Sequence, residues 1–135
     1  MESEIINGIE ANAAILSVGG DKAFHDFLSR LFMDELIDVI CADSIESANA
    51  VLLTTGVGAI ILDFHIGEER GLDFIIDLKR SEKTARIPVI AFTATLLRVN
   101  LYIKAVLLGA YHCFSKSVSS DEIVKAVKLA IADRM

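Results

Sequence analysis

The stretch from Gly58 to Gly67 constrains the fold of this chain more than any other segment. Its apolar run, Ala59-Ile60-Ile61-Leu62, ends in the carboxylate of Asp63, and turn residues follow. A short apolar run without polar alternation predicts a strand that is buried on both faces. In open α/β sheets, ligands bind at the carboxyl ends of the strands, so Asp63 is the first candidate for a functional residue. The structural alternative is that Asp63 only closes the strand or caps a turn.

Short apolar runs and helical patterns alternate along the rest of the chain. We predict strands at residues 13–18, 39–42, 59–63, 87–93 and 111–115. The predicted helices begin after Asp21, after Asp43 or Ser44, after Gly71, at Thr95 and at a capping box over 119–122. This alternation favours a parallel sheet with helices on both faces. We expect an α/β fold, a flavodoxin-like (βα)5 three-layer sandwich with strand order 2-1-3-4-5.

Length and composition fit one domain without a membrane segment. Residues 1–12 have weak periodicity and predict a flexible N-terminal arm, and 13–135 form the domain. No apolar run reaches the roughly 18 residues of a membrane span, and we identify no signal peptide. A net charge of −6 argues against a nucleic-acid surface. Cys41 and Cys113 lie in apolar runs, so we expect both to be buried and reduced in a cytoplasmic protein.

Three polar residues follow neighbouring strands of the predicted sheet. Asp63 ends the third strand, Thr93 the fourth and Lys116 the fifth. Because the carboxyl ends of parallel strands meet at one edge, we expect these side chains to lie close together. A carboxylate nucleophile beside a hydroxyl and an ammonium that bind oxygen atoms suits phosphoryl transfer.

The sequence resembles the receiver domains of two-component response regulators over about residues 13–132. The matching segments are Ile60-Ile61-Leu62-Asp63 with Gly71-Leu72, Pro88 to Ala94, and Gly109-Ala110 leading to Lys116. The resemblance implies that Asp63 is the phosphoacceptor, that Thr93 contacts the phosphoryl group and that Lys116 pairs with it. It also implies a signalling module rather than an enzyme, with a sensor histidine kinase or another signalling protein as partner.

The chain departs from the family where a metal is held. The family places two acidic residues after the first strand to bind Mg²⁺, and this chain has Gly19-Gly20 there. Asp63 is then the main carboxylate for a metal, with Asp21 as a second candidate that is better suited to capping a helix. Since a hard cation needs several oxygen ligands, we expect a degenerate Mg²⁺ site.

Two further departures lie near the lysine. Cys113 occupies the position where the family usually has a switch Tyr or Phe, and it is too small for a rotating aromatic plug. Ser117 replaces the proline that usually follows the lysine. Because a cis bond before a residue other than proline costs about 2.5–4 kcal/mol, we expect a trans peptide here.

The predicted helix over 95–108 is apolar almost all round. Its many large side chains, among them Leu97, Leu101 and Leu108, cannot all face the core. Exposed apolar patches mark interfaces, so we expect a homodimer or partner surface on this helix. The alternative is that the N-terminal arm covers the helix.

We therefore predict an atypical receiver, a pseudo-receiver that acts mainly through protein contacts. One alternative is a fully functional Mg²⁺-dependent phosphoacceptor that uses Asp21 or water to hold the metal. Another is a small-molecule domain that binds cobalamin or flavin, since Asp63 and His65 make an imperfect Asp-x-His motif. Gly19-Gly20 lacks the further glycines of nucleotide-binding loops.

Overall fold

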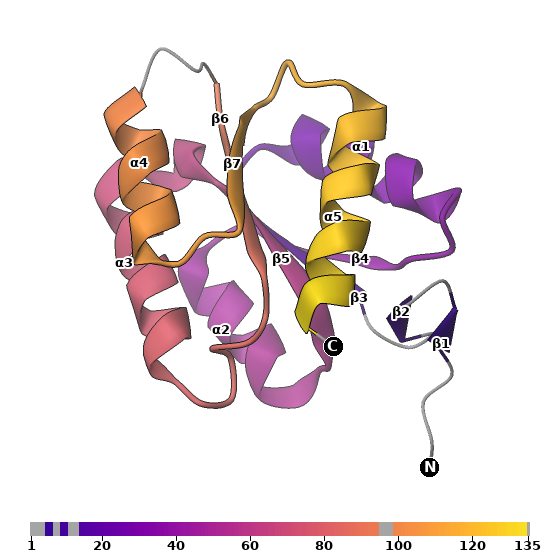
Figure 1. Ribbon diagram of the computed structural model, residues 1–135, viewed down its shortest axis with the longest axis horizontal. Helices are drawn as coiled ribbons and strands as arrows, with labels where there is room; N and C mark the ends of the chain where they lie inside the picture. Colours follow the sequence, from indigo (N-terminus) through magenta and orange to yellow (C-terminus); the bar gives the residue numbers. More distant parts are fainter. Residues whose placement is uncertain (1–4, 7–8, 11–13, 95–98, 135) are drawn as a thin grey trace.

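A computed structural model of the protein describes residues 5–6, 9–10, 14–94 and 99–134 (Figure 1). Its centre is a parallel sheet with the strand order β4-β3-β5-β6-β7. The strands of this sheet are β3 (Ala14–Val18), β4 (Val39–Ala42), β5 (Val57–Asp63), β6 (Val89–Thr93) and β7 (His112–Ser115). Numbered from the first strand of this sheet, the order is 2-1-3-4-5, which confirms the predicted topology.

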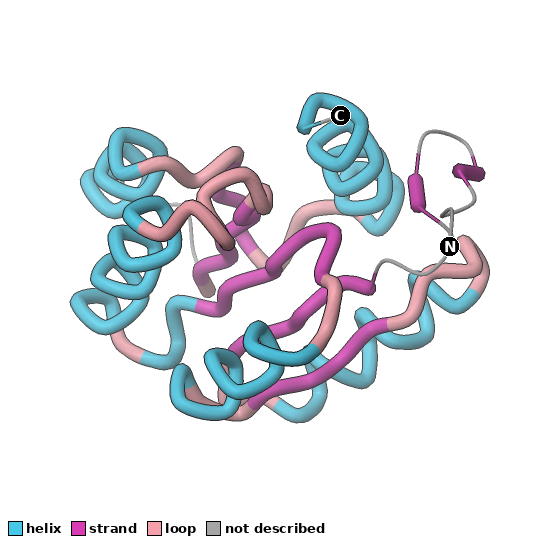
Figure 2. The backbone as a smooth tube through the Cα atoms, turned by 90° about the horizontal axis from the view of Figure 1, so that it is seen from below, coloured by secondary structure: helices cyan, strands magenta, loops and turns pink. Residues whose placement is uncertain are grey.

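Helices cover both faces of the sheet, as Figures 1 and 2 show. One face packs against α1 (Lys22–Met33) and α5 (Ser120–Arg134). The other packs against α2 (Ile45–Thr54), α3 (Glu68–Arg80) and α4 (Val99–Leu108). The result is the three-layer, flavodoxin-like sandwich expected from the sequence.

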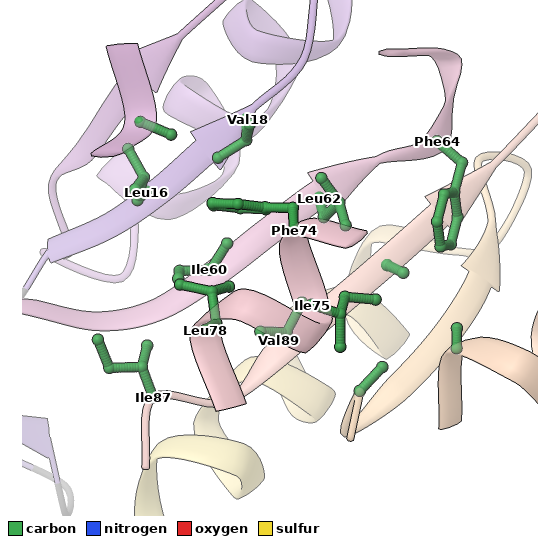
Figure 3. Close-up of a cluster of buried hydrophobic side chains, with 14 of the residues drawn as sticks. Leu16, Val18, Ile60, Leu62, Phe64, Phe74, Ile75, Leu78, Ile87 and Val89 are labelled. Carbon is green, nitrogen blue, oxygen red and sulfur yellow. The ribbon is translucent and has the colours of Figure 1, made fainter. Parts of the chain in front are cut away.

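The central strand β5 is buried along its whole length, as its apolar sequence predicts. Ile60 and Leu62 belong to the core on the side of α2, α3 and α4 (Figure 3). Ala59 and Ile61 belong to the core on the side of α1 and α5. Successive side chains of a strand point to opposite faces, so one apolar run supplies both cores. The same strand delivers Asp63 to the carboxyl edge of the sheet.

The segment after β5 differs from the sequence prediction. A short 3₁₀ helix, η1 (Phe64–Ile66), follows the strand, and α3 begins at Glu68 rather than after Gly71. Gly71 therefore lies inside a helix. A Cβ at this position would come within 2.7 Å of the Phe64 ring, so the glycine permits close packing of helix against η1 instead of forming a loop.

The N-terminal segment contains a small antiparallel pair that the sequence does not predict. Strand β1 (Ile5–Ile6) pairs with β2 (Ile9–Glu10), and β2 contacts α5. The flexibility expected for residues 1–12 stays a prediction.

The two cysteines differ in environment, which corrects one prediction. Cys113 is buried in β7, as expected, but Cys41 is exposed. Cys41 lies on β4, one of the two edge strands of the sheet, and its side chain lies 4.0 Å from the hydroxyl of Ser29 in α1. Cys113 lies on the other edge strand, β7, but belongs to the core on the side of α2, α3 and α4, so the edge position alone does not decide burial. Within the described residues, no helix is long and apolar enough to cross a membrane.

Candidate functional site

The sheet brings the ends of three neighbouring strands together at its carboxyl edge. Asp63 of β5 pairs in register with Phe92 of β6, one residue before Thr93. The backbone amide of Lys116 donates to the carbonyl of Thr93 at 2.9 Å. Asp63 and Thr93 are buried, with 2% and 6% of their surfaces exposed. The sequence prediction that these positions share one edge is therefore confirmed in position.

The carboxylate of Asp63 has a different contact on each oxygen. Its Oδ1 accepts a hydrogen bond from the backbone amide of His65 at 2.9 Å. Its Oδ2 lies 2.7 Å from Nζ of Lys116, in an ion pair that lacks the direction of a hydrogen bond. The buried Oδ2 of Asp63 therefore accepts no hydrogen bond within the described residues. His65 is exposed, as the sequence predicts, but it lies in the 3₁₀ helix η1 rather than in a loop.

Lys116 also pairs with a second carboxylate. Its Nζ donates to Oδ2 of Asp21 at 3.0 Å and lies 4.8 Å from the centre of the Phe24 ring. Burial lowers the pKa of Lys116, but the two carboxylates outweigh burial and raise it overall. The hydrogen bond from Lys116, with that from the Phe24 amide, holds the pKa of Asp21 below its ordinary value. The ammonium is thus a permanent charge of the site at neutral pH.

Asp21 has two roles, of which the sequence revealed one. Its Oδ1 accepts from the amide of Phe24 at 3.2 Å, so it caps α1 as predicted. Its contact with Lys116 joins residues 95 positions apart and was not expected from the sequence. The short spacing from the end of β3 was the only available signal, because it places Asp21 at the same sheet edge.

The loop between β3 and α1 is closed against Asp63. Gly19 has a φ of +155°, and a Cβ there would lie 2.7 Å from Cβ of Asp63. At this position an aspartate would be strained and would displace the buried carboxylate. Gly20 is different, because a Cβ there would meet nothing within 4 Å. Of the two glycines that stand where the family has acidic residues, only Gly20 has room for a side chain.

The buried side chain of His25 forms a hydrogen bond with the backbone of this loop. His25 accepts from or donates to Ser17 at 2.7 Å through Nδ1, and Nε2 lies 2.6 Å from the carbonyl oxygen of Gly19. A carbonyl only accepts, so Nε2 carries the proton and Nδ1 of a neutral ring accepts from the Ser17 hydroxyl. His25 therefore has a structural role, because it ties the loop at Gly19 to β3. Ser17, the one polar residue in an apolar strand, was the signal in the sequence for this buried pair.

The residues present do not fit a Mg²⁺ ion. Gly19 and Gly20 offer no carboxylate, and Asp21 and Asp63 both form ion pairs with the ammonium of Lys116. The described part of the chain holds no group of three or more His, Cys, Asp or Glu side chains placed to bind a metal. Mg²⁺ demands near-octahedral oxygen geometry, which this donor set does not supply.

Cys113 occupies the position where receiver domains usually have an aromatic switch residue, and its thiol is buried. Cys113 is 2% exposed, and burial raises its pKa to about 11. The nearby Tyr111 contacts α5, where its hydroxyl donates a hydrogen bond to Asp133 at 2.6 Å. Phe114 stacks on His112 with ring centres 4.1 Å apart. The Lys116–Ser117 peptide is trans, as the sequence predicts.

The predicted interface residues on α4 require correction. Leu97 lies outside the described residues, Leu101 is 4% exposed and Leu108 is half-buried against the core. The sequence of a helix that is apolar on all sides does not show which side faces the core, so the buried residues could not be told from the exposed ones. The exposed apolar face of α4 consists of Val99, Tyr102, Ile103, Val106 and Leu107.

Comparisons with known proteins agree with this geometry. A family model described as the response regulator receiver domain matches residues 15–128. No curated protein matches the sequence at a significant level. A solved signal receiver domain of a DNA-binding response regulator from Colwellia psychrerythraea is 27% identical, with a TM-score of 0.79 over 88% of this chain and 98% of that one.

Two further solved structures show the same fold at lower identity. A receiver domain of a Francisella response regulator is 22% identical, with a TM-score of 0.79 over 92% of this chain and 100% of that one. A response regulator from Thermotoga maritima is 21% identical, with a TM-score of 0.80 over 90% and 98%.

Proposed function

The chain belongs to the response regulator receiver domain family, and on that premise we propose that Asp63 accepts a phosphoryl group in a two-component phosphorelay. Receiver domains are in general signalling modules rather than enzymes, and they interact with histidine kinases and other signalling proteins. The observation that carries the proposal is the buried carboxylate of Asp63 held 2.7 Å from the Lys116 ammonium at the carboxyl edge of the sheet. Thr93 ends the strand between them.

The chemistry proposed for these residues is a displacement at phosphorus. An oxygen of the ionised Asp63 attacks the phosphorus of the donor, the bond from phosphorus to the leaving group breaks, and the leaving group departs with the bonding electrons. The product is an acyl phosphate on Asp63. Lys116 pairs with the phosphoryl oxygens and the Thr93 hydroxyl binds one of them, which lowers the energy of the charge that develops during transfer.

We propose that this transfer is slow because the Mg²⁺ site is degenerate. A metal at such a site supplies several kcal/mol of stabilisation to the transferring group. Losing about 4 kcal/mol slows the step by roughly a thousandfold. Signalling by the domain then depends mainly on protein contacts rather than on rapid modification. Among the described residues no observation favours the cobalamin or flavin alternative, since His65 is an exposed residue of η1 whose backbone amide bonds to Asp63.

We propose the exposed apolar face of α4 as the contact surface, with a second copy of the chain as its partner. Its five side chains are between 38% and 80% exposed, with Leu107 the most exposed. Leaving such a continuous apolar surface in water is unfavourable, and burial of it on association stabilises a dimer. The same surface serves a heterologous signalling partner if the dimer does not form.

The phosphoacceptor is tested by incubating the protein with a small-molecule phosphodonor and measuring the intact mass. We expect slow addition of one phosphoryl group to the wild type and none to Asp63→Asn. Asp77→Asn is the matched control, because Asp77 is an exposed aspartate on α3. Equal labelling of the wild type and Asp63→Asn would exclude Asp63 as the acceptor.

The contact surface is tested by sedimentation across a range of concentrations. We expect Leu107→Glu to weaken self-association, because it places a charge at the most exposed position of the face. Leu53→Glu, at a leucine of α2 that is 72% exposed, is the matched control and should leave association unchanged. A wild type that stays monomeric at high concentration contradicts the dimer.

A further inference from the structure

We propose that the Lys116 ammonium is the resident cation of this site, held by Asp21 and Asp63 in the place that a divalent metal takes in a site with more acidic residues. The inference rests on the proposed function only in treating Asp63 as the reactive carboxylate. It goes further in identifying which residue excludes the metal. Although the acidic pair of the family is missing, two carboxylates, Asp21 and Asp63, still lie at this edge of the sheet. Because both pair with the ammonium of Lys116, they are not free to bind a metal ion.

The position of the ammonium is fixed from several sides. It lies 2.7 Å from Oδ2 of Asp63 and 3.0 Å from Oδ2 of Asp21. The Phe24 ring lies beneath it, with the ring centre 4.8 Å away, a favourable arrangement for a cation. Its own backbone amide is bound to Thr93. The side chain of Lys116 is 22% exposed, so the charge is largely shielded from water.

The position of the second carboxylate, that of Asp21, is also fixed by local contacts. Asp21 is the N-cap of α1, so its backbone and side chain are set by the start of the helix. The loop before it is held by the bond between Gly19 and the buried His25. Asp21 therefore does not depend on Lys116 for its place, and the ammonium binds between two carboxylates that are already positioned.

The geometry suits an ammonium better than Mg²⁺. The two nitrogen-to-oxygen distances exceed the about 2.1 Å of a Mg²⁺–oxygen bond, so a bridging metal would require both carboxylates to move inward. Inward movement of Asp63 would also lengthen the hydrogen bond that its Oδ1 accepts from the backbone amide of His65 at 2.9 Å. Two carboxylates and one ammonium leave a single negative charge, which attracts a divalent ion far less than two unpaired carboxylates do.

The test is a Mg²⁺ titration without any phosphodonor, followed by amide NMR at the site. If Lys116 excludes the metal, then Lys116→Met, which leaves Asp21 and Asp63 unpaired, binds Mg²⁺ at least about tenfold more tightly than the wild type. Lys125→Met removes an exposed lysine of α5 and is the matched control, with the affinity of the wild type expected. Equal Mg²⁺ affinity of Lys116→Met and the wild type overturns the proposal.

A second measurement keeps the test decisive if Lys116→Met does not fold. The side-chain ammonium signal of Lys116 in the wild type is followed by nitrogen-15 NMR as Mg²⁺ is added. A signal that stays in place at millimolar Mg²⁺ supports the proposal, and a saturable shift that reports displacement of the ammonium overturns it. Because no phosphodonor is present, failure here leaves phosphorylation of Asp63 open, and a lack of phosphorylation would leave this result unchanged.

Discussion

Replacing either glycine of the β3–α1 loop by alanine should have very different consequences. A Cβ at position 19 would lie 2.7 Å from Cβ of Asp63, well inside the about 3.5–4.0 Å of an ordinary carbon contact. The φ of +155° at Gly19 adds backbone strain. A Cβ at position 20 would meet nothing within 4 Å, and Gly20 is exposed. The two substitutions therefore differ in two respects, the contact with the buried carboxylate and the backbone strain.

The size of the effect follows from these two costs. Backbone strain of this kind costs about 1–3 kcal/mol. Overpacking against a buried side chain costs about 1–3 kcal/mol more, because Asp63 must move away from its contacts with His65 and Lys116. We expect Gly19→Ala to lower the free energy of unfolding by about 3 kcal/mol. Gly20→Ala should change it by less than about 0.5 kcal/mol, as for most exposed positions.

Urea denaturation followed by circular dichroism measures this difference. The wild type and both variants are compared at one pH, and the slopes are checked for agreement so that the midpoints report stability. Unfolding of Gly19→Ala and Gly20→Ala at the same urea concentration would contradict the predicted difference. In that case Gly19 would not be in close contact with Asp63 in solution.

Two further predictions concern charge and thiol chemistry. Since Lys116 holds the pKa of Asp21 below its ordinary value of 3.8, the ion pair stabilises the fold above that value and its contribution is lost as the pH falls through the lowered pKa. The difference in free energy of unfolding between the wild type and Asp21→Asn should therefore narrow in acid, and a difference that is constant from neutral to acidic pH would contradict the ion pair. Exposed Cys41 should react promptly with a coloured thiol reagent, while Cys113, buried and with a pKa of about 11, should react only after unfolding. Prompt reaction of both thiols in the native protein would contradict the burial of Cys113.

The fold was largely predictable because its signals are local. The apolar run before Asp63 predicted a strand buried on both faces, and its alternation with helical patterns predicted a parallel sheet. The capping residues Asp21 and Ser44 were also readable, since a cap acts on amides within one turn. Strand ends then placed Asp63, Thr93 and Lys116 at one edge without any knowledge of side-chain positions.

The parts that were missed depend on distant contacts or on helix phase. The pairing of Lys116 with Asp21 is set by side-chain direction across the sheet edge, which spacing does not encode. Gly71 looked like a loop residue because its reason, the nearby Phe64 ring, is a packing contact. Leu101 was placed on the exposed side of α4 because a helix with apolar residues on every side does not reveal which stripe faces the sheet.

The dependence of the phosphorylation rate of Asp63 on Mg²⁺ tests the proposed site most directly. The rate is measured with a small-molecule phosphodonor, with and without Mg²⁺, by the intact mass of the wild type against Asp63→Asn. We predict slow labelling at a rate that Mg²⁺ leaves essentially unchanged, because Lys116 already holds the carboxylate and the second acidic ligands are glycines. Rapid and stoichiometric labelling that requires Mg²⁺ would contradict a degenerate metal site and would make the domain a conventional phosphoacceptor.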